Sequence, residues 1–144
     1  METRIEVKDF TRAGYKEVVI YHTWRVAILN YIDELLPEKI DNFQAHLNTD
    51  EVFVLLEGRC ILYTAEVQDS QLVDIEGLDM VKGKIYNMKK GVYHTHTLSD
   101  DAKVLIVEND DTCLENSPKI IIDTEINKQL VAIRNDLWRH HTRP

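Results

Sequence analysis

Cysteine is scarce in this chain, and so are the features that carry a protein into or across a membrane. Two cysteines, Cys60 and Cys113, stand among 144 residues, too few for a disulfide framework or a thiolate zinc cluster. No apolar run approaches the length that spans a bilayer. The opening METRIEVKDF lacks the apolar core of a signal peptide. These absences lead us to expect a cytoplasmic protein.

Positive charge is also in short supply. Lys and Arg number 17 against 25 Asp and Glu, which gives a formal net charge of −8. Such a field repels phosphate backbones and anionic membranes, so we expect no nucleic-acid partner and no membrane partner. The sequence also lacks a phosphate loop, a dinucleotide fingerprint and a Ser-His-Asp or Cys-His nucleophile arrangement.

Short apolar or alternating segments fill most of the chain and predict β structure. Ten strands are expected, at Val18–Tyr21, Trp24–Tyr31, Ile40–His46, Glu51–Leu56, Arg59–Glu66, Gln71–Ile75, Ile85–Met88, Tyr93–Leu98, Ala102–Glu108 and Lys119–Ile122. So many short antiparallel strands must close into a barrel or a sandwich to hide their edges. We therefore predict an all-β fold in a single domain over residues 1–144, with the barrel core at about 15–122.

Turn-forming residues separate the predicted strands. Glu57-Gly58, Lys89-Lys90-Gly91 and Ser99-Asp100-Asp101 are predicted to close three hairpins. Ile32–Leu36, which Pro37 stops, predicts a single helical turn.

The C-terminal region predicts an α-helix over about 124–139. Asp123 or Thr124 can cap this helix. Its apolar positions recur at spacings of four, three and four residues, so they share one face; they are Ile126, Leu130, Ile133 and Leu137. That face must cover the barrel or a second subunit.

Two stretches place polar side chains within the strand pattern, QAHLNTDEVFVLLEG (44–58) and GKIYNMKKGVYHTHTL (83–98). Residues two apart in a strand point to the same side, so Gln44 faces with His46, and His94 with His96. A barrel can direct these four side chains and Glu51 toward one interior. Imidazole nitrogen and carboxylate oxygen are ligands of mid-series divalent ions. The alternatives are a metal-free polar cavity or solvated positions near turns.

The first stretch resembles the first motif of the cupin family. That motif runs His, one residue, His, three or four residues, Glu, six residues, Gly. This chain has Gln44, His46, Glu51 and Gly58 at the same spacing. The family's opening Gly is replaced by Glu38.

The second stretch resembles the second cupin motif, which runs Gly, five residues, Pro, one residue, Gly, two residues, His, three residues, Asn. Gly83, Gly91 and His94 match it, whereas Lys89 and Leu98 replace the Pro and the Asn. The resemblance implies a cupin-type double-stranded β-helix, or jelly-roll barrel, followed by the C-terminal α-helix.

The resemblance also implies one divalent metal ion (Mn, Fe, Ni or Zn) bound by Gln44, His46, Glu51 and His94. Gln44 stands where the family has its first histidine, and an amide oxygen is a weaker donor than imidazole. His96 is a candidate to supply the missing imidazole or to orient a ligand.

A cupin of this kind would bind, or act on, a small polar metabolite such as a sugar or an organic acid. If it is an enzyme, the resemblance implies a metal-dependent isomerase, lyase or dioxygenase, with His96 and Tyr86 as the first candidates for proton handling. The competing interpretation is a non-catalytic ligand-binding or sensing module with a degenerate metal site. Small cupins commonly pair through their sheets, so we expect a homodimer.

Several further residues have a weaker pattern. Glu108 is a marginal pocket candidate, and Tyr63 and Met88 either line the cavity or pack in the core. Cys60 is expected to be buried. The three remaining histidines are expected at the surface; they are His22, His140 and His141.

Overall fold

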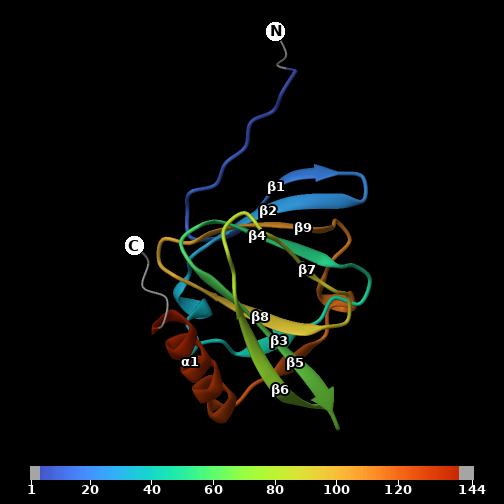
Figure 1. Cartoon of the computed structure of the whole chain (residues 1–144). Coiled ribbons are helices and arrows are strands. Elements are labelled where there is room, and N and C mark those ends of the chain that lie inside the picture. Colours follow the sequence, from blue (N-terminus) through green and yellow to red (C-terminus); the bar gives the residue numbers. More distant parts are fainter. Residues whose placement is uncertain (1–3, 140–144) are drawn as a thin grey trace.

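A computed structural model describes residues 4–139, so the prediction for His140 and His141 lies outside the described residues. Two antiparallel sheets face each other, and helix α1 (Thr124–Arg139) packs beside one of them (Figure 1). No helix within residues 4–139 combines the length and the apolar character needed to cross a membrane.

Each of the ten predicted segments contains a strand, with ends that shift by up to four residues. The strands are β1 (Gly14–Tyr21), β2 (Trp24–Asn30), β3 (Asn42–Gln44), β4 (Glu51–Glu57), β5 (Cys60–Gln68), β6 (Gln71–Asp79), β7 (Ile85–Met88), β8 (Tyr93–Leu98), β9 (Lys103–Asn109) and β10 (Lys119–Ile121). The helical turn predicted before Pro37 is a 3₁₀ helix at Asp33–Leu35, and a second 3₁₀ helix lies at Leu114–Asn116.

Apart from the pairs β1–β2 and β5–β6, consecutive strands belong to opposite sheets. One sheet has the order β1-β2-β9-β4-β7, and the other has the order β10-β3-β8-β5-β6. Each sheet has five strands, and their alternation gives the double-stranded β-helix that the sequence predicted.

The three predicted hairpins are wrong. The turns at 57–58, 89–91 and 99–101 join strands of opposite sheets, because β4 does not pair with β5, β7 with β8 or β8 with β9. Gly58 still makes a necessary turn: its φ is +70°, and a Cβ there would lie 2.6 Å from the Ala102 Cα. Consecutive strands pair as hairpins at β1–β2 and β5–β6.

The barrel interior is filled by inward side chains of both sheets, among them Ala27, Leu29, Phe53, Leu55, Leu62, Leu98, Val104 and Ile106. The two sheets therefore enclose one apolar core. The polar residues discussed below continue these inward rows at the strand ends.

Helix α1 covers the outer face of the sheet that contains β5 and β6. Asp123 caps it, since the Ile126 amide donates to the Asp123 Oδ1 at 3.0 Å. Leu130 is fully buried in a second cluster with Phe43, Ile61 and Tyr63. The predicted apolar face thus covers the chain's own barrel. Tyr63 belongs to this layer and not to the barrel cavity, because its hydroxyl donates to the Leu130 carbonyl at 2.9 Å.

Candidate metal centre

The inward rows of the barrel end in polar residues at one end. On β4 the buried row is Leu55, Phe53 and Glu51, and on β8 it includes His94. Glu51 and His94 border a cavity of about 310 Å³, which Gln44, His46 and His96 also line. The cavity therefore collects the four predicted metal ligands and His96.

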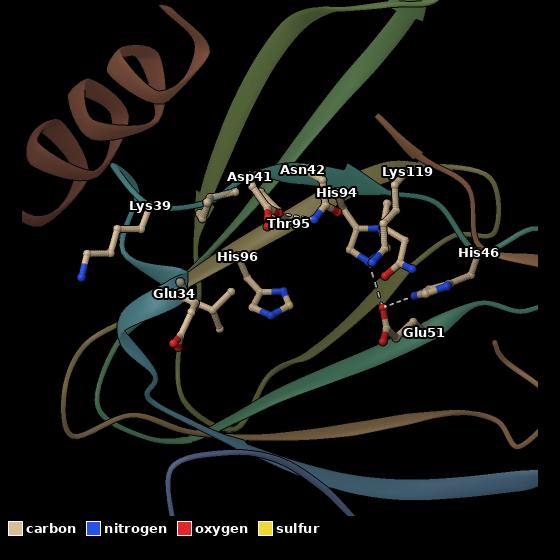
Figure 2. Close-up of a pocket in the computed structure, with 13 residues that line it drawn as sticks. Glu34, Lys39, Asp41, Asn42, His46, Glu51, His94, Thr95, His96 and Lys119 are labelled. Carbon is tan, nitrogen blue, oxygen red and sulfur yellow. Dashed lines mark hydrogen bonds and ion pairs between the residues drawn. The ribbon is translucent and has the colours of Figure 1, made fainter. Parts of the chain in front are cut away.

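His46, Glu51 and His94 converge on a single point (Figure 2). The Nε2 atoms of His94 and His46 lie 2.9 and 3.3 Å from the same Glu51 Oε1. One donor atom from each residue lies within 4.8 Å of the others, and all three residues are buried. This is a compact group of two imidazoles and one carboxylate.

The far side of each imidazole is fixed by a hydrogen bond. The His94 Nδ1 lies 2.9 Å from the Val92 carbonyl oxygen, which only accepts, so this nitrogen carries a hydrogen. The His46 Nδ1 lies 2.7 Å from the Ser117 Oγ. That hydroxyl in turn donates to the Asn116 Oδ1 at 3.2 Å and therefore accepts from His46.

The hydrogen bonds at the two Nδ1 atoms determine whether the Nε2 atoms carry a hydrogen or a lone pair. In a neutral imidazole whose Nδ1 carries the hydrogen, the Nε2 holds a lone pair. Both Nε2 lone pairs of His46 and His94 then face the Glu51 oxygen, an arrangement that is repulsive unless a proton or a cation lies between them. The donor set therefore fits a metal ion, with the outer hydrogen bonds that usually orient metal-binding histidines.

Electrostatics within the group favour an ionised carboxylate. Burial opposes it, but without an ion a proton on the Nε2 of His46 or His94 donates a hydrogen bond to Glu51, and such bonds hold the pKa of Glu51 well below its usual range. Burial likewise disfavours protonation of His46, yet the hydrogen bond with Glu51 raises the pKa of His46 overall. The negative charge of Glu51 is thus available to a cation.

Gln44 lies on the wall of the same cavity. Its Cα is the register partner of His94 between β3 and β8, so the two side chains share a face. The Gln44 Nε2 donates to the Ser117 carbonyl at 3.4 Å. This contact holds the amide beside the group formed by His46, Glu51 and His94.

His96 points into the cavity without joining the group (Figure 2). Burial lowers the pKa of His96 to about 4, so the ring is neutral near pH 7. Its Nδ1 is buried and has no hydrogen-bond partner among the described residues. The ring is therefore placed where it could meet a ligand.

Tyr86 is not brought to the histidines. It is the register partner of Phe53, packs against the barrel core and borders a different cavity, with Leu62, Thr64 and Met88. Its hydroxyl accepts a hydrogen bond from the Val81 amide at 2.8 Å.

Sequence reasoning missed Arg25 and Ser117 and underrated Glu108. Arg25 and Glu108 are both buried, and the Arg25 Nη2 lies 2.7 Å from the Glu108 Oε1. Strand alternation carried a usable signal: Arg25 precedes the inward Ala27 and Leu29, as Glu108 follows Ile106. Ser117 lies in a loop and has no comparable pattern.

No family model matches the chain, and no curated protein does. Among solved structures, the nucleoside dehydratase Pac13 of Streptomyces has 8% identity and a TM-score of 0.54, over 81% of this chain and 87% of Pac13. The QdtA 3,4-ketoisomerase of Thermoanaerobacterium thermosaccharolyticum has 12% identity and a TM-score of 0.51, over 65% of this chain and 64% of QdtA.

A third match is an RmlC-like cupin family protein with a double-stranded β-helix fold from Methanocaldococcus jannaschii. It has 15% identity and a TM-score of 0.49, over 75% of this chain and 93% of that protein. Identities this low show the fold alone. The chain has the cupin fold, with two antiparallel sheets that form a double-stranded β-helix and one C-terminal helix, as its sequence predicted.

Proposed function

We propose that this cupin binds one divalent metal ion through His46, Glu51 and His94 and uses the site to bind and act on a small polar metabolite. The observation that carries the proposal is the pair of imidazoles whose Nε2 atoms face one buried carboxylate oxygen. Gln44 borders the same cavity as a weaker neutral donor. The protein would act as a single domain in the cytoplasm.

A bound ion would supply Lewis-acid chemistry, polarising a carbonyl or holding adjacent oxygens of a substrate. The chain's own contribution would be positioning and proton transfer. His96 is neutral, faces the cavity and has an unpartnered Nδ1, so it is the better placed of the two residues predicted for proton handling. Tyr86 borders another cavity and has no role in this proposal.

The solved structures that share the fold support isomerase or lyase chemistry over oxygen-dependent cleavage. Pac13 is a nucleoside dehydratase that has been solved with uridine, and QdtA is a 3,4-ketoisomerase that has been solved with TDP. We propose a sugar or an organic acid as the substrate class. Fold alone does not transfer an activity, so this choice rests on the metal site and the polar cavity.

A non-catalytic binding or sensing module is the competing function. Gln44 favours it, because loss of the first histidine of the family motif is what a degenerate metal site would show. The two functions differ first in metal content.

Metal analysis of protein purified without a histidine tag and without chelators tests the proposal. We expect close to one divalent ion per chain in the wild type, and none in His46→Ala or His94→Ala. An empty wild type after incubation with manganese, iron, nickel and zinc would favour the binding module. Full metal content in the variant that carries both His46→Ala and His94→Ala would show that other residues bind the metal.

We also propose a homodimer formed through the edge strand β1 and its neighbour β2. Large apolar side chains are exposed there, namely Tyr15, Ile20, Tyr21 and Trp24. A two-fold interface would remove them from water. Helix α1 offers less to such an interface, because its apolar face packs on its own barrel.

A further inference from the structure

Three charged side chains, Arg25, Glu108 and Glu51, form a row across the inner face of one sheet. This row lies beside the group formed by His46, Glu51 and His94, which we call the metal group. Arg25 on β2 is the register partner of Glu108 on β9. Val52 on β4 pairs with Val107 on β9, so the next position of that ladder sets Glu51 opposite Glu108. Two buried acids therefore lie side by side, an arrangement that is unfavourable without a cation or a shared proton.

Arg25 forms a hydrogen bond with only one of the two carboxylate oxygens of Glu108. The Glu108 Oε1 lies 2.7 Å from the Arg25 Nη2 and accepts a hydrogen bond from the Tyr15 hydroxyl at 3.3 Å. The Glu108 Oε2 is buried and has no hydrogen-bond partner within residues 4–139. It lies 3.9 Å from the His46 Nε2, the nitrogen that faces Glu51. One oxygen is anchored, and the other is directed at the metal group.

Arg25 does not occupy the second oxygen of Glu108. Its Nε is also buried without a hydrogen-bond partner within residues 4–139, so it does not bond the Glu108 Oε2. The Arg25 Nη1 lies 3.4 Å from the Glu17 Oε1 and donates to the carbonyl of Asp110 at 3.1 Å. The Arg25 guanidinium thus has acceptors apart from Glu108. The Glu108 Oε2, which has no partner within residues 4–139, is therefore free to contact a cation located between Glu108, Glu51 and His46.

We propose that Glu108 is the fourth protein ligand of the metal ion, through its Oε2. This inference rests on the proposed function and adds a donor that neither cupin motif contains. Two donors on one ion, each about 2.1 Å from it, lie at most about 4.2 Å apart. The separations of 2.9 and 3.3 Å from Glu51 to the two histidines, and of 3.9 Å from His46 to Glu108, satisfy that limit. Glu108 lies outside the group whose donors are all within 4.8 Å of one another, so ligation would require its side chain to move toward the ion. Glu108 would compensate for the weak donor at Gln44.

This ligand set also defines the class of metal. Two carboxylates balance the charge of a divalent ion, and two imidazoles complete a mixed nitrogen and oxygen set. Carboxylate oxygen suits manganese better than it suits copper, whereas imidazole suits zinc, copper, iron and nickel. Exchange of an imidazole for a carboxylate therefore moves the selectivity of the site toward Mn²⁺.

Calorimetric titration with Mn²⁺ tests the assignment on three metal-free proteins: the wild type, Glu108→Gln and Glu17→Gln. Glu17 is the matched control, because it also contacts Arg25 but does not border the neighbouring cavity that Glu108 lines together with His46 and Glu51. We expect Glu108→Gln to weaken Mn²⁺ binding by at least about tenfold and Glu17→Gln to change it by less than about twofold. Equal affinities in the wild type and Glu108→Gln would overturn the proposal.

A second variant separates ligation from simple charge. Glu108→Asp keeps the negative charge near Arg25 but draws the carboxylate back by one methylene. We expect it to weaken Mn²⁺ binding as well and to change the visible absorption of the Co²⁺-loaded protein. Wild-type affinity and an unchanged Co²⁺ spectrum would contradict ligation by Glu108, and would do so even if Glu108→Gln failed to fold.

The two proposals fail in different ways. Absence of binding by the wild type to Mn²⁺, Fe²⁺, Ni²⁺ and Zn²⁺ alike would overturn the metal site and the role of Glu108 together. Tight binding that is lost in His94→Ala but unchanged in Glu108→Gln and Glu108→Asp would leave the site of His46, Glu51 and His94 standing and refute only the fourth ligand.

Discussion

Gln44 and His94 lie directly opposite each other across the β3–β8 ladder, with their side chains on the inner face. In the cupin motifs both positions carry a metal-binding histidine. This chain carries an amide at one of the two positions and forms the β3–β8 pair with it. The exchange is therefore compatible with the fold, and its consequence is expected at the proposed metal site.

Restoring the imidazole tests this relationship. We expect Gln44→His to tighten Mn²⁺ or Zn²⁺ binding by about tenfold or more, because imidazole is the stronger donor. Asn42→His serves as the control, since it adds an imidazole at the mouth of the same cavity but not opposite His94. An affinity that Gln44→His leaves unchanged would show that this side chain points away from the ion.

His96 predicts a pH dependence of stability in the metal-free protein. Burial lowers its pKa to about 4, whereas the unfolded chain takes up the proton near 6.5. The folding contribution of the neutral ring is therefore complete above about pH 6.5 and is lost as the pH falls toward 4. His96→Asn removes this pH-dependent contribution to the free energy of unfolding.

Urea unfolding at pH 7 and pH 5 measures the effect. The stability advantage of the wild type over His96→Asn should shrink by about 2 kcal/mol between the two pH values. Parallel pH dependences of the two proteins would contradict a His96 ring that stays neutral in the folded protein.

The docking of helix α1 predicts a difference between two leucines. Leu130 is fully buried between the helix and the sheet, and Leu114 is 73% exposed. Leu130→Ala should lower the free energy of unfolding by about 2–5 kcal/mol, and Leu114→Ala by less than about 0.5 kcal/mol. Similar losses in the two variants, measured by urea unfolding, would argue against the packing described for α1.

The homodimer predicts a mass of twice 16.8 kDa by light scattering at micromolar concentration. Ile20→Glu on β1 should give the single-chain mass, because it buries a charge in the proposed interface. Ile85→Glu is the control, since Ile85 is also exposed but lies on β7 at the other edge of the sheet. A wild type that already has the single-chain mass would exclude the dimer.

The sequence was sufficient for the strands and for part of the site. Alternation located all ten strands, and the spacing of His46, Glu51 and His94 indicated a metal group that the structure brings together. Residues two apart share a strand face whatever the partner strand is, so these inferences needed no knowledge of pairing.

Features that depend on strand pairing could not be predicted in this way. Glu57-Gly58 reverses the chain, but the residues of the turn do not specify that β5 joins the opposite sheet. The row of Arg25, Glu108 and Glu51 likewise depends on the register among β2, β9 and β4, which closure of the whole barrel sets. Tyr86 shows the same limit, since its strand was predicted correctly and its cavity was not.

The most direct test of the account is anomalous diffraction from crystals saturated with Mn²⁺. We expect one anomalous peak at about 2.0–2.2 Å from the Nε2 atoms of both His46 and His94 and from an oxygen of Glu51. No peak at this position, with both imidazoles still hydrogen-bonded to Glu51, would contradict it.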